Sequence, residues 1–180
     1  MEKRVVITGL GAITPIGKNV EEFWEGIKTN KCGIAPITEF NTEKFKVKLA
    51  GEVKNYNPEE YFDKRSCKRL DKFSQFEIIA SKEAMKDSGI TPENTDMNRV
   101  GVVISSGIGG LTTIEKENEH YIEKGPDRVS PMYIPMSICN MAAGNVAIDW
   151  RNCWAPASSS RTSSTALTLW ASPTVWHGPA

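Results

Sequence analysis

Apolar and polar residues follow one another along the chain in a pattern that predicts strands and helices in turn. Two short β-branched runs, 4–8 and 99–106, each precede a glycine-rich turn and are expected to form buried strands. Apolar residues at helical spacing predict a helix over about 71–87, and further helices are expected over 111–124 and 137–148. Strand and helix in this order indicate an α/β fold with a largely parallel, helix-covered sheet.

Shorter signals fill the region between these elements. Asn19 is a good N-cap for a helix, and Asn57 followed by Pro58 starts another. Residues 49–53 are expected to form a short strand. The glycines Gly9 and Gly11 follow the first predicted strand, but a dinucleotide-binding loop needs a third glycine where this chain has Thr14. The glycines therefore predict a plain connection rather than a nucleotide site.

The pattern changes abruptly near residue 149. Residues 149–180 hold three charged side chains and no lysine or glutamate, although both are abundant earlier. Four of the five tryptophans lie in this segment, together with six serines. A flexible extension is one explanation, but so many tryptophans are unusual in disordered chains. We expect a shifted reading frame or a fused foreign sequence, and hence one region over 1–148 and a poorly ordered, atypical tail over 149–180.

Composition narrows the function classes. Lysine plus arginine and aspartate plus glutamate number 22 each, so the chain lacks the basic excess typical of nucleic-acid binders. No apolar run approaches the roughly 20 residues of a membrane span, and the start has no apolar core long enough for a signal peptide. The four cysteines lie far apart without paired spacing, which favours free thiols over a disulfide framework or a zinc site. We expect a cytoplasmic protein without metal or cofactor.

Several blocks of sequence resemble the elongating β-ketoacyl-acyl carrier protein synthases. The blocks occur in the order of that family at 5–17, 73–76, 100–110, 130–138 and 140–148. The second and third read Phe-Ser-Gln-Phe and Val-Gly-Val-Val-Ile-Ser-Ser-Gly-Ile-Gly-Gly, and the last reads Asn-Met-Ala-Ala-Gly-Asn-Val-Ala-Ile. The resemblance covers residues 1–148 and is greater to the dissociated bacterial enzymes than to polyketide megasynthase domains.

The resemblance implies a thiolase-like fold, in which two similar halves build a five-layered αβαβα architecture and the enzyme is a homodimer. This chain would supply the N-terminal half. The implied reaction is a decarboxylative Claisen condensation between an acyl thioester and malonyl-acyl carrier protein. It needs a cysteine thiolate favoured by a helix N-terminus, backbone donors for the thioester oxygen, and two histidines.

The resemblance also implies roles for particular residues. Lys64 to Arg69 form a basic patch, which by itself is most simply a solvated face. Because acyl carrier protein is strongly acidic, the family match assigns carrier-protein contacts to Arg65, Lys68 and Arg69. Ile108 and Gly107 match the acyl pocket near the nucleophile, where Ile108 acts as a gate. The alternative for Ile108 is a turn residue that fills a gap in the core.

The chain departs from the family at the nucleophile. Counting forward from the last block, the catalytic cysteine falls at Ser163, and no neighbouring residue confirms that register. Cys153 lies ten residues too early, and the histidines His120 and His177 do not match the catalytic pair. A serine also needs an adjacent base, for which no candidate is evident. We expect the chain as written to be inactive.

Three interpretations of function therefore remain. The first is a 3-oxoacyl-carrier-protein synthase of fatty acid biosynthesis. The second is a ketosynthase of a polyketide pathway. The third is a protein without catalysis, either a chain-length-factor-like partner or an isolated fragment.

Overall fold

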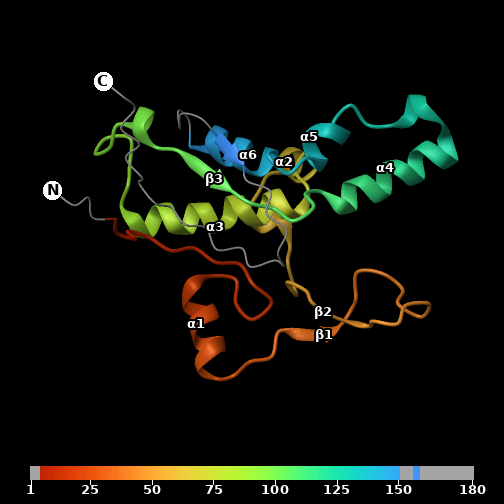
Figure 1. Cartoon of the computed structure of the whole chain (residues 1–180), viewed down its shortest axis with the longest axis horizontal. Coiled ribbons are helices and arrows are strands. Elements are labelled where there is room, and N and C mark those ends of the chain that lie inside the picture. Colours follow the sequence, from red (N-terminus) through yellow and green to blue (C-terminus); the bar gives the residue numbers. More distant parts are fainter. Residues whose placement is uncertain (1–4, 151–155, 159–180) are drawn as a thin grey trace.

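The computed structural model describes residues 5–150 and 156–158, and α-helices dominate them (Figure 1). The helices and strands, in chain order, are α1 (Val20–Lys28), β1 (Ile34–Pro36), β2 (Leu49–Gly51), α2 (Lys64–Cys67), α3 (Lys72–Ser88), β3 (Val102–Ile104), α4 (Leu111–Lys124), α5 (Tyr133–Ser137), α6 (Met141–Asp149) and β4 (Pro156–Ser158). Single 3₁₀ turns lie at η1 (Pro58–Glu60), η2 (Met97–Arg99) and η3 (Pro126–Arg128).

Helix α3 is the centre of the structure, and its predicted ends are confirmed. Asp71 caps its start with an extended backbone, and Gly89 ends it in the left-handed conformation at φ 66°. Glycine has no Cβ and adopts that conformation at little cost, which is why the helix stops there. The helix is therefore fixed by its own sequence at both ends.

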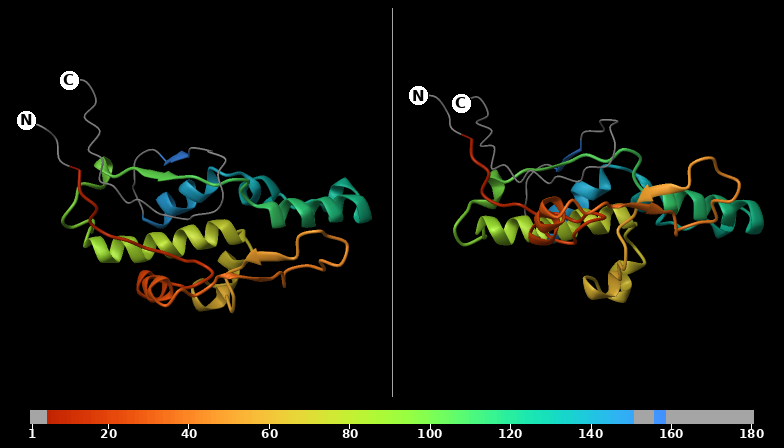
Figure 2. Two further views of the ribbon diagram at one scale, coloured as in Figure 1. Left: turned by 60° about the horizontal axis from the view of Figure 1, so that its bottom comes forward. Right: turned by 90° about the horizontal axis from the view of Figure 1, so that it is seen from below.

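Two apolar clusters pack on α3. Helix α6 lies along it (Figure 2, left), and Ile78 of α3 is buried with Ala142, Ala143 and Val146 of α6. Alanines at this contact let the two helices approach closely. On another face, Ile79 and Ala80 pack with Ile13 of the N-terminal segment. Helix α3 thus holds the first and last parts of the described chain together.

The N-terminal segment lies against α3 without forming a strand. A Cβ at Gly9 would lie 2.2 Å from the Ala84 carbonyl oxygen, and one at Gly11 would lie 1.9 Å from the Ala80 carbonyl oxygen. The glycines therefore serve close packing. The backbone N–H groups around them donate to carboxylates of α3: Leu10 to Asp87, and Ala12 to Glu83, both at 2.9 Å. These two amides are therefore already engaged by side chains of α3.

The prediction of a buried strand over 4–8 is wrong for the described residues 5–8. They form no strand, and Val5, Val6 and Ile7 are 71%, 51% and 54% exposed. A strand is stable only when its backbone groups pair with a neighbour, and none of the described strands pairs with this run. The residue types of this run favour a strand, but the described residues 5–8 form none.

The sheet is smaller than predicted within the described residues, where two separate strand pairs occur. Strands β1 and β2 are antiparallel, with Ala35 opposite Ala50, and β2 confirms the strand expected near residue 49. Strands β3 and β4 are parallel, with Val103 opposite Ala157. Helices α4, α5 and α6 form the connection between β3 and β4, which is the βαβ arrangement of an α/β fold.

Two further helix predictions are confirmed and one is corrected. Helix α4 has the expected bounds, and Asn19 caps α1 by accepting from the Glu22 N–H at 2.7 Å. The helix expected over 137–148 begins later, at Met141, and is α6, whereas Ser137 is the last residue of the separate helix α5. Ile138 between them has an extended backbone (φ −76°, ψ 139°), which interrupts the helical hydrogen bonds.

Residues beyond 148 contribute to the described fold. Helix α6 continues through Asp149, which pairs with Lys82 of α3 at 3.2 Å. Trp150 packs against the cluster around Ile78. Among the described residues, no helix has the length and apolarity to span a membrane, and no three of the His, Cys, Asp and Glu side chains cluster as metal ligands.

Candidate functional site

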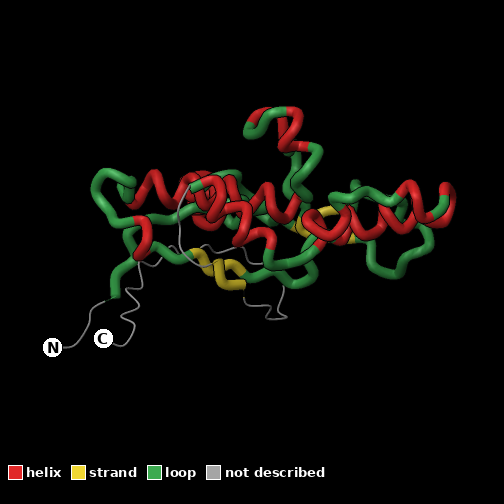
Figure 3. Tube along the Cα trace, turned by 90° about the horizontal axis from the view of Figure 1, so that it is seen from above, coloured by secondary structure: helices red, strands yellow, loops and turns green. Residues whose placement is uncertain are grey.

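The basic patch occupies α2 and the two residues after it. Asp63 caps the helix by accepting from the Ser66 N–H at 2.6 Å, so a turn of helix forms in a segment that projects from the rest of the molecule (Figure 2, right; Figure 3). Hydrogen bonding to Ser66 lowers the pKa of Asp63, and nearby Arg65 contributes less. The helix therefore presents its basic side chains on a projecting, stable turn.

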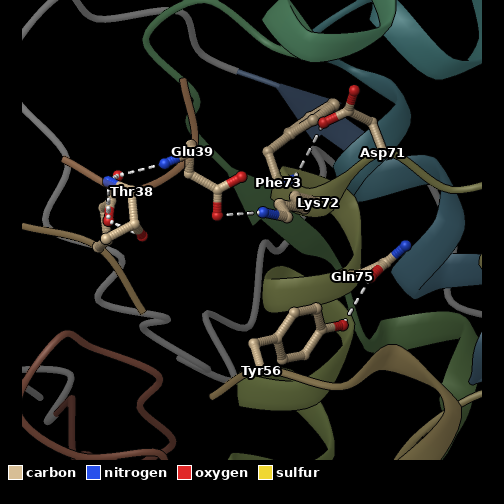
Figure 4. Close-up of polar contacts among 8 residues, drawn as sticks. Thr38, Glu39, Tyr56, Asp71, Lys72, Phe73 and Gln75 are labelled. Carbon is tan, nitrogen blue, oxygen red and sulfur yellow. Dashed lines mark hydrogen bonds and ion pairs between the residues drawn. The ribbon is translucent and has the colours of Figure 1, made fainter. Parts of the chain in front are cut away.

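Arg65, Lys68 and Arg69 are all exposed. Within the described residues, none of the three forms an ion pair with a carboxylate. The next basic residue, Lys72, is different because it pairs with Glu39 at 2.6 Å (Figure 4). The patch thus keeps its positive charge available for a partner, whereas Lys72 already has a carboxylate partner.

The turn at residues 107–110 carries the second candidate site. Ile108 is 63% exposed, and Gly107 is exposed beside it. Gly109 has φ +83°, and a Cβ there would lie 2.3 Å from the Ser137 carbonyl oxygen. The Gly109 N–H donates to Ser106 Oγ at 3.0 Å, and the Gly110 N–H donates to the Ser137 oxygen at 2.9 Å. The turn is therefore fastened to the end of α5 with Ile108 displayed on it.

Asp71 connects the two candidate sites, and sequence reasoning identified it only as the start of a helix. It follows Arg69 of the patch by two residues, and its Oδ2 accepts from the N–H and Oγ1–H of Thr113, three residues beyond the turn. The capping role was visible in the sequence. Its contact with a residue 42 positions away was not.

Tyr56 and Gln75 support the segment that carries the patch. The Tyr56 hydroxyl donates to Gln75 Oε1 at 2.6 Å (Figure 4), and Gln75 Nε2 donates to the Leu70 carbonyl oxygen at 2.8 Å. Burial is the main reason that the pKa of Tyr56 is raised well above its ordinary value. The phenol is therefore a fixed hydrogen-bond donor that ties the segment before α2 to α3.

Glu77 is a second residue that the sequence analysis did not single out. It lies on α3, only 4% exposed, and burial raises its pKa to about 7. Glutamate is rarely buried in proteins unless it is paired, so its residue type favours an exposed position on the helix, and the sequence analysis followed that preference.

Other predicted residues lie elsewhere. Ser163, the position expected for the nucleophile, lies outside the described residues, as do Cys153 and His177. Cys32, Cys67 and Cys139 are free thiols. Asp71, two residues after the patch, thus contacts the helix that follows the Ile108 turn, and the structure gives no geometry for the nucleophile position.

Comparison with known proteins identifies the family. Residues 2–169 match the model of the N-terminal domain of β-ketoacyl synthases. The chain is 47% identical over 147 residues to 3-oxoacyl-[acyl-carrier-protein] synthase 2 of Staphylococcus aureus (strain N315) and 41% identical over 148 residues to the protein of the same name from Synechocystis sp.. Each alignment covers 82% of this chain and 36% of the relative, so the chain spans about a third of these relatives.

Solved structures share the fold. The ishigamide ketosynthase/chain length factor superposes with a TM-score of 0.75 at 25% identity, over 90% of this chain and 40% of the other. A β-ketoacyl synthase from Burkholderia phymatum gives a TM-score of 0.67 at 20% identity, over 88% of this chain and 38% of the other. The predicted thiolase-like α/β fold is confirmed, and the chain belongs to the β-ketoacyl synthase family, whose N-terminal domain it matches.

Proposed function

We propose that this chain is the N-terminal part of a 3-oxoacyl-[acyl-carrier-protein] synthase of fatty acid biosynthesis. Such an enzyme condenses an acyl thioester with malonyl-acyl carrier protein and releases carbon dioxide. The observation that carries the proposal is the 47% identity over 147 residues to the S. aureus synthase 2. An identity of this size exceeds the 25% to the ishigamide ketosynthase/chain length factor and the 20% to the Burkholderia phymatum synthase.

The basic patch would receive the carrier protein. Its three exposed cations have no carboxylate partner among the described residues, and they sit on a projecting turn of helix. Because acyl carrier protein is acidic, complementary charge raises its association rate and fixes its orientation. A structural neighbour of 24% identity is a type II ketosynthase in complex with its acyl carrier protein, which is consistent with this assignment.

Ile108 and Gly107 would form part of the acyl pocket. A Cβ at Gly107 would meet no atom within 4 Å, so space is open beside the turn. Ile108 projects an apolar side chain into an exposed position, where a fatty acyl chain would cover it and remove apolar surface from water. Its alternative role, filling a gap in the core, agrees less well with an exposure of 63%.

Carrier-protein binding is tested by reversing the charge of the patch. The triple variant Arg65→Glu, Lys68→Glu, Arg69→Glu is expected to weaken binding of acyl carrier protein at least tenfold at low salt and to flatten its salt dependence. The matched control reverses the same charge on the exposed lysines 44, 46 and 48 of the loop before β2. Equal weakening by both triple variants would contradict a specific site.

We also propose that the full enzyme is a homodimer. Four large apolar side chains of α4 and α5 are exposed, namely Leu111, Tyr121, Ile122 and Ile134. A subunit interface would remove such side chains from water. Sedimentation equilibrium measures the mass in solution, and a mass of one chain at micromolar concentration would argue against a dimer.

The chain as written is proposed not to condense substrates. The family's cysteine position, counted along the sequence, holds Ser163, and a serine hydroxyl is a poor nucleophile without an adjacent base. We further propose that residues 149–180 are encoded in a shifted frame. Resequencing the coding DNA across codon 149 tests this: a single-base change that restores Thr-Ala-Cys supports it, and an unchanged frame overturns it.

A chain-length-factor-like partner is the second candidate function. The structure with a TM-score of 0.75 belongs to a ketosynthase/chain length factor, and a partner of that type needs no cysteine. Co-purification with a separate, catalytically complete ketosynthase would favour this candidate over an isolated condensing enzyme.

A further inference from the structure

The Asp71 carboxylate contacts the first turns of two different helices. The residue is 7% exposed. Its Oδ1 accepts from the Phe73 N–H at 3.4 Å at the start of α3 (Figure 4). Its Oδ2 accepts from the Thr113 N–H at 3.0 Å and from Thr113 Oγ1–H at 2.5 Å, in the first turn of α4. Both carboxylate oxygens are therefore engaged by helix starts.

Helix α4 has no cap of its own. Its N-cap residue is Gly110, which has no side chain to accept a hydrogen bond. Thr113 is the third residue of α4, and the N–H at this position is the one that a capping side chain normally binds. Asp71 supplies the missing acceptor from 42 residues away, and its negative charge also suits the positive end of the helix dipole.

This contact fixes the turn that displays Ile108. A Cβ at Gly110 would lie 2.3 Å from the Met136 carbonyl oxygen and 3.1 Å from Asp71 Oδ2. The turn is thus held from one side by the end of α5 and from the other by Asp71. Without the hydrogen bonds from Thr113 to Asp71, the first turn of α4 would fray, and the turn at residues 107–110 would lose one of its two supports.

We propose that Asp71 is a positioning residue for the acyl pocket, because it caps α4 from α3 and so sets where Ile108 lies. The link to the pocket rests on the function proposed above, whereas the capping of α4 by Asp71 does not. Asp71 itself is not proposed to touch substrate; it acts through Thr113 and the turn.

Two substitutions separate positioning from general stability. In Asp71→Asn the amide has one acceptor oxygen in place of two, so it can cap one of the two helices but not both. Thr113→Val replaces the hydroxyl donor by a methyl group of similar size and changes no residue of α3. The matched control is Asp63→Asn, which alters another N-cap aspartate, on exposed α2.

The first measurement is amide hydrogen exchange on the full chain. Residues 107–114 are expected to exchange at least tenfold faster in Asp71→Asn, and faster in Thr113→Val, with less than a twofold change in α6. Asp63→Asn is expected to leave residues 107–114 unchanged. Unchanged exchange in the turn, or uniform acceleration over the whole chain, overturns the proposal. If Asp71→Asn fails to fold, the exchange of residues 107–114 in Thr113→Val decides whether the proposal stands.

The second measurement is binding of acyl-pantetheine thioesters with chains of eight, twelve and sixteen carbons. The ratio of Kd values between the shortest and longest chains is expected to change at least threefold in Asp71→Asn and to stay constant in Asp63→Asn. An unchanged ratio overturns the role in the pocket. If the wild-type chain binds no thioester, the proposed pocket fails, and the exchange result still decides whether Asp71 positions the turn.

Discussion

Replacement of Glu77 by glutamine is expected to stabilise the protein at neutral and alkaline pH. Glu77 is almost fully buried on α3, between Ser74 and Ser81, which are each 1% exposed. Burial raises its pKa from 4.5 to about 7 because a charged carboxylate loses its water there. Glutamine has nearly the same shape and carries no charge at any pH.

The magnitude follows from the two pKa values. They differ by about 2.5, which at about 1.4 kcal/mol per pH unit corresponds to about 3 kcal/mol. The folded protein holds the Glu77 proton more tightly than the unfolded chain does. Below pH 4.5 both states are protonated, so burial of Glu77 as a carboxylate then costs no free energy of unfolding. The cost grows as pH rises from 4.5 to about 7 and is complete above that pH.

The assay is urea unfolding of wild type and Glu77→Gln at pH 5 and pH 8. The free energy of unfolding of the variant relative to wild type is expected to rise between the two pH values by an amount approaching about 3 kcal/mol. Glu52→Gln is the control, since hydrogen bonds from Thr38 lower the pKa of half-buried Glu52, so that any change of its effect with pH should have the opposite sign. A difference between wild type and Glu77→Gln that stays constant with pH would refute the reasoning.

Two stability predictions concern the N-terminal segment. Gly11→Ala places a Cβ 1.9 Å from the Ala80 oxygen and is expected to lower the free energy of unfolding by about 2–4 kcal/mol. Gly107→Ala is the control, because a Cβ there has no atom within 4 Å, and it is expected to cost far less. Equal losses of the two variants in urea denaturation would contradict this. Glu83→Gln weakens a carboxylate that binds two backbone N–H groups at 2.9 Å, and is expected to cost about 1–3 kcal/mol and to speed exchange of both amides. The exposed Glu21→Gln is its control, and a similar loss there would count against the argument.

Local signals predicted those parts of the fold that depend on neighbours in sequence. The ends of α3 follow from a capping aspartate and a terminal glycine, and α4 follows from its spacing. The run from Val5 to Ile7 misled because its composition suits a strand, while strand formation depends on a partner elsewhere. The break at Ile138 depends on a backbone conformation that many residues can adopt.

The features of the candidate site also fall into those that the sequence predicted and those that it did not. The basic patch and the Ile108 turn were predicted from sequence, because charge and glycine spacing are visible there. The contact between Asp71 and Thr113 could not be predicted, since nothing near either residue indicates the other. Burial of Glu77 was missed for a related reason: it follows from what packs on α3 and not from the helix itself.

The close fit of Gly9 and Gly11 on α3 also has a consequence for the order of events during synthesis. The Ala12 amide binds a side chain 71 residues further along, and the Leu10 amide binds one 77 residues further along. At about 5–20 residues per second, a ribosome needs on the order of 4–15 s to make the intervening chain. For that time the apolar run beside these glycines has nothing to dock on. The first residues to emerge should therefore be among the last to fold, and a chaperone has several seconds in which to bind them.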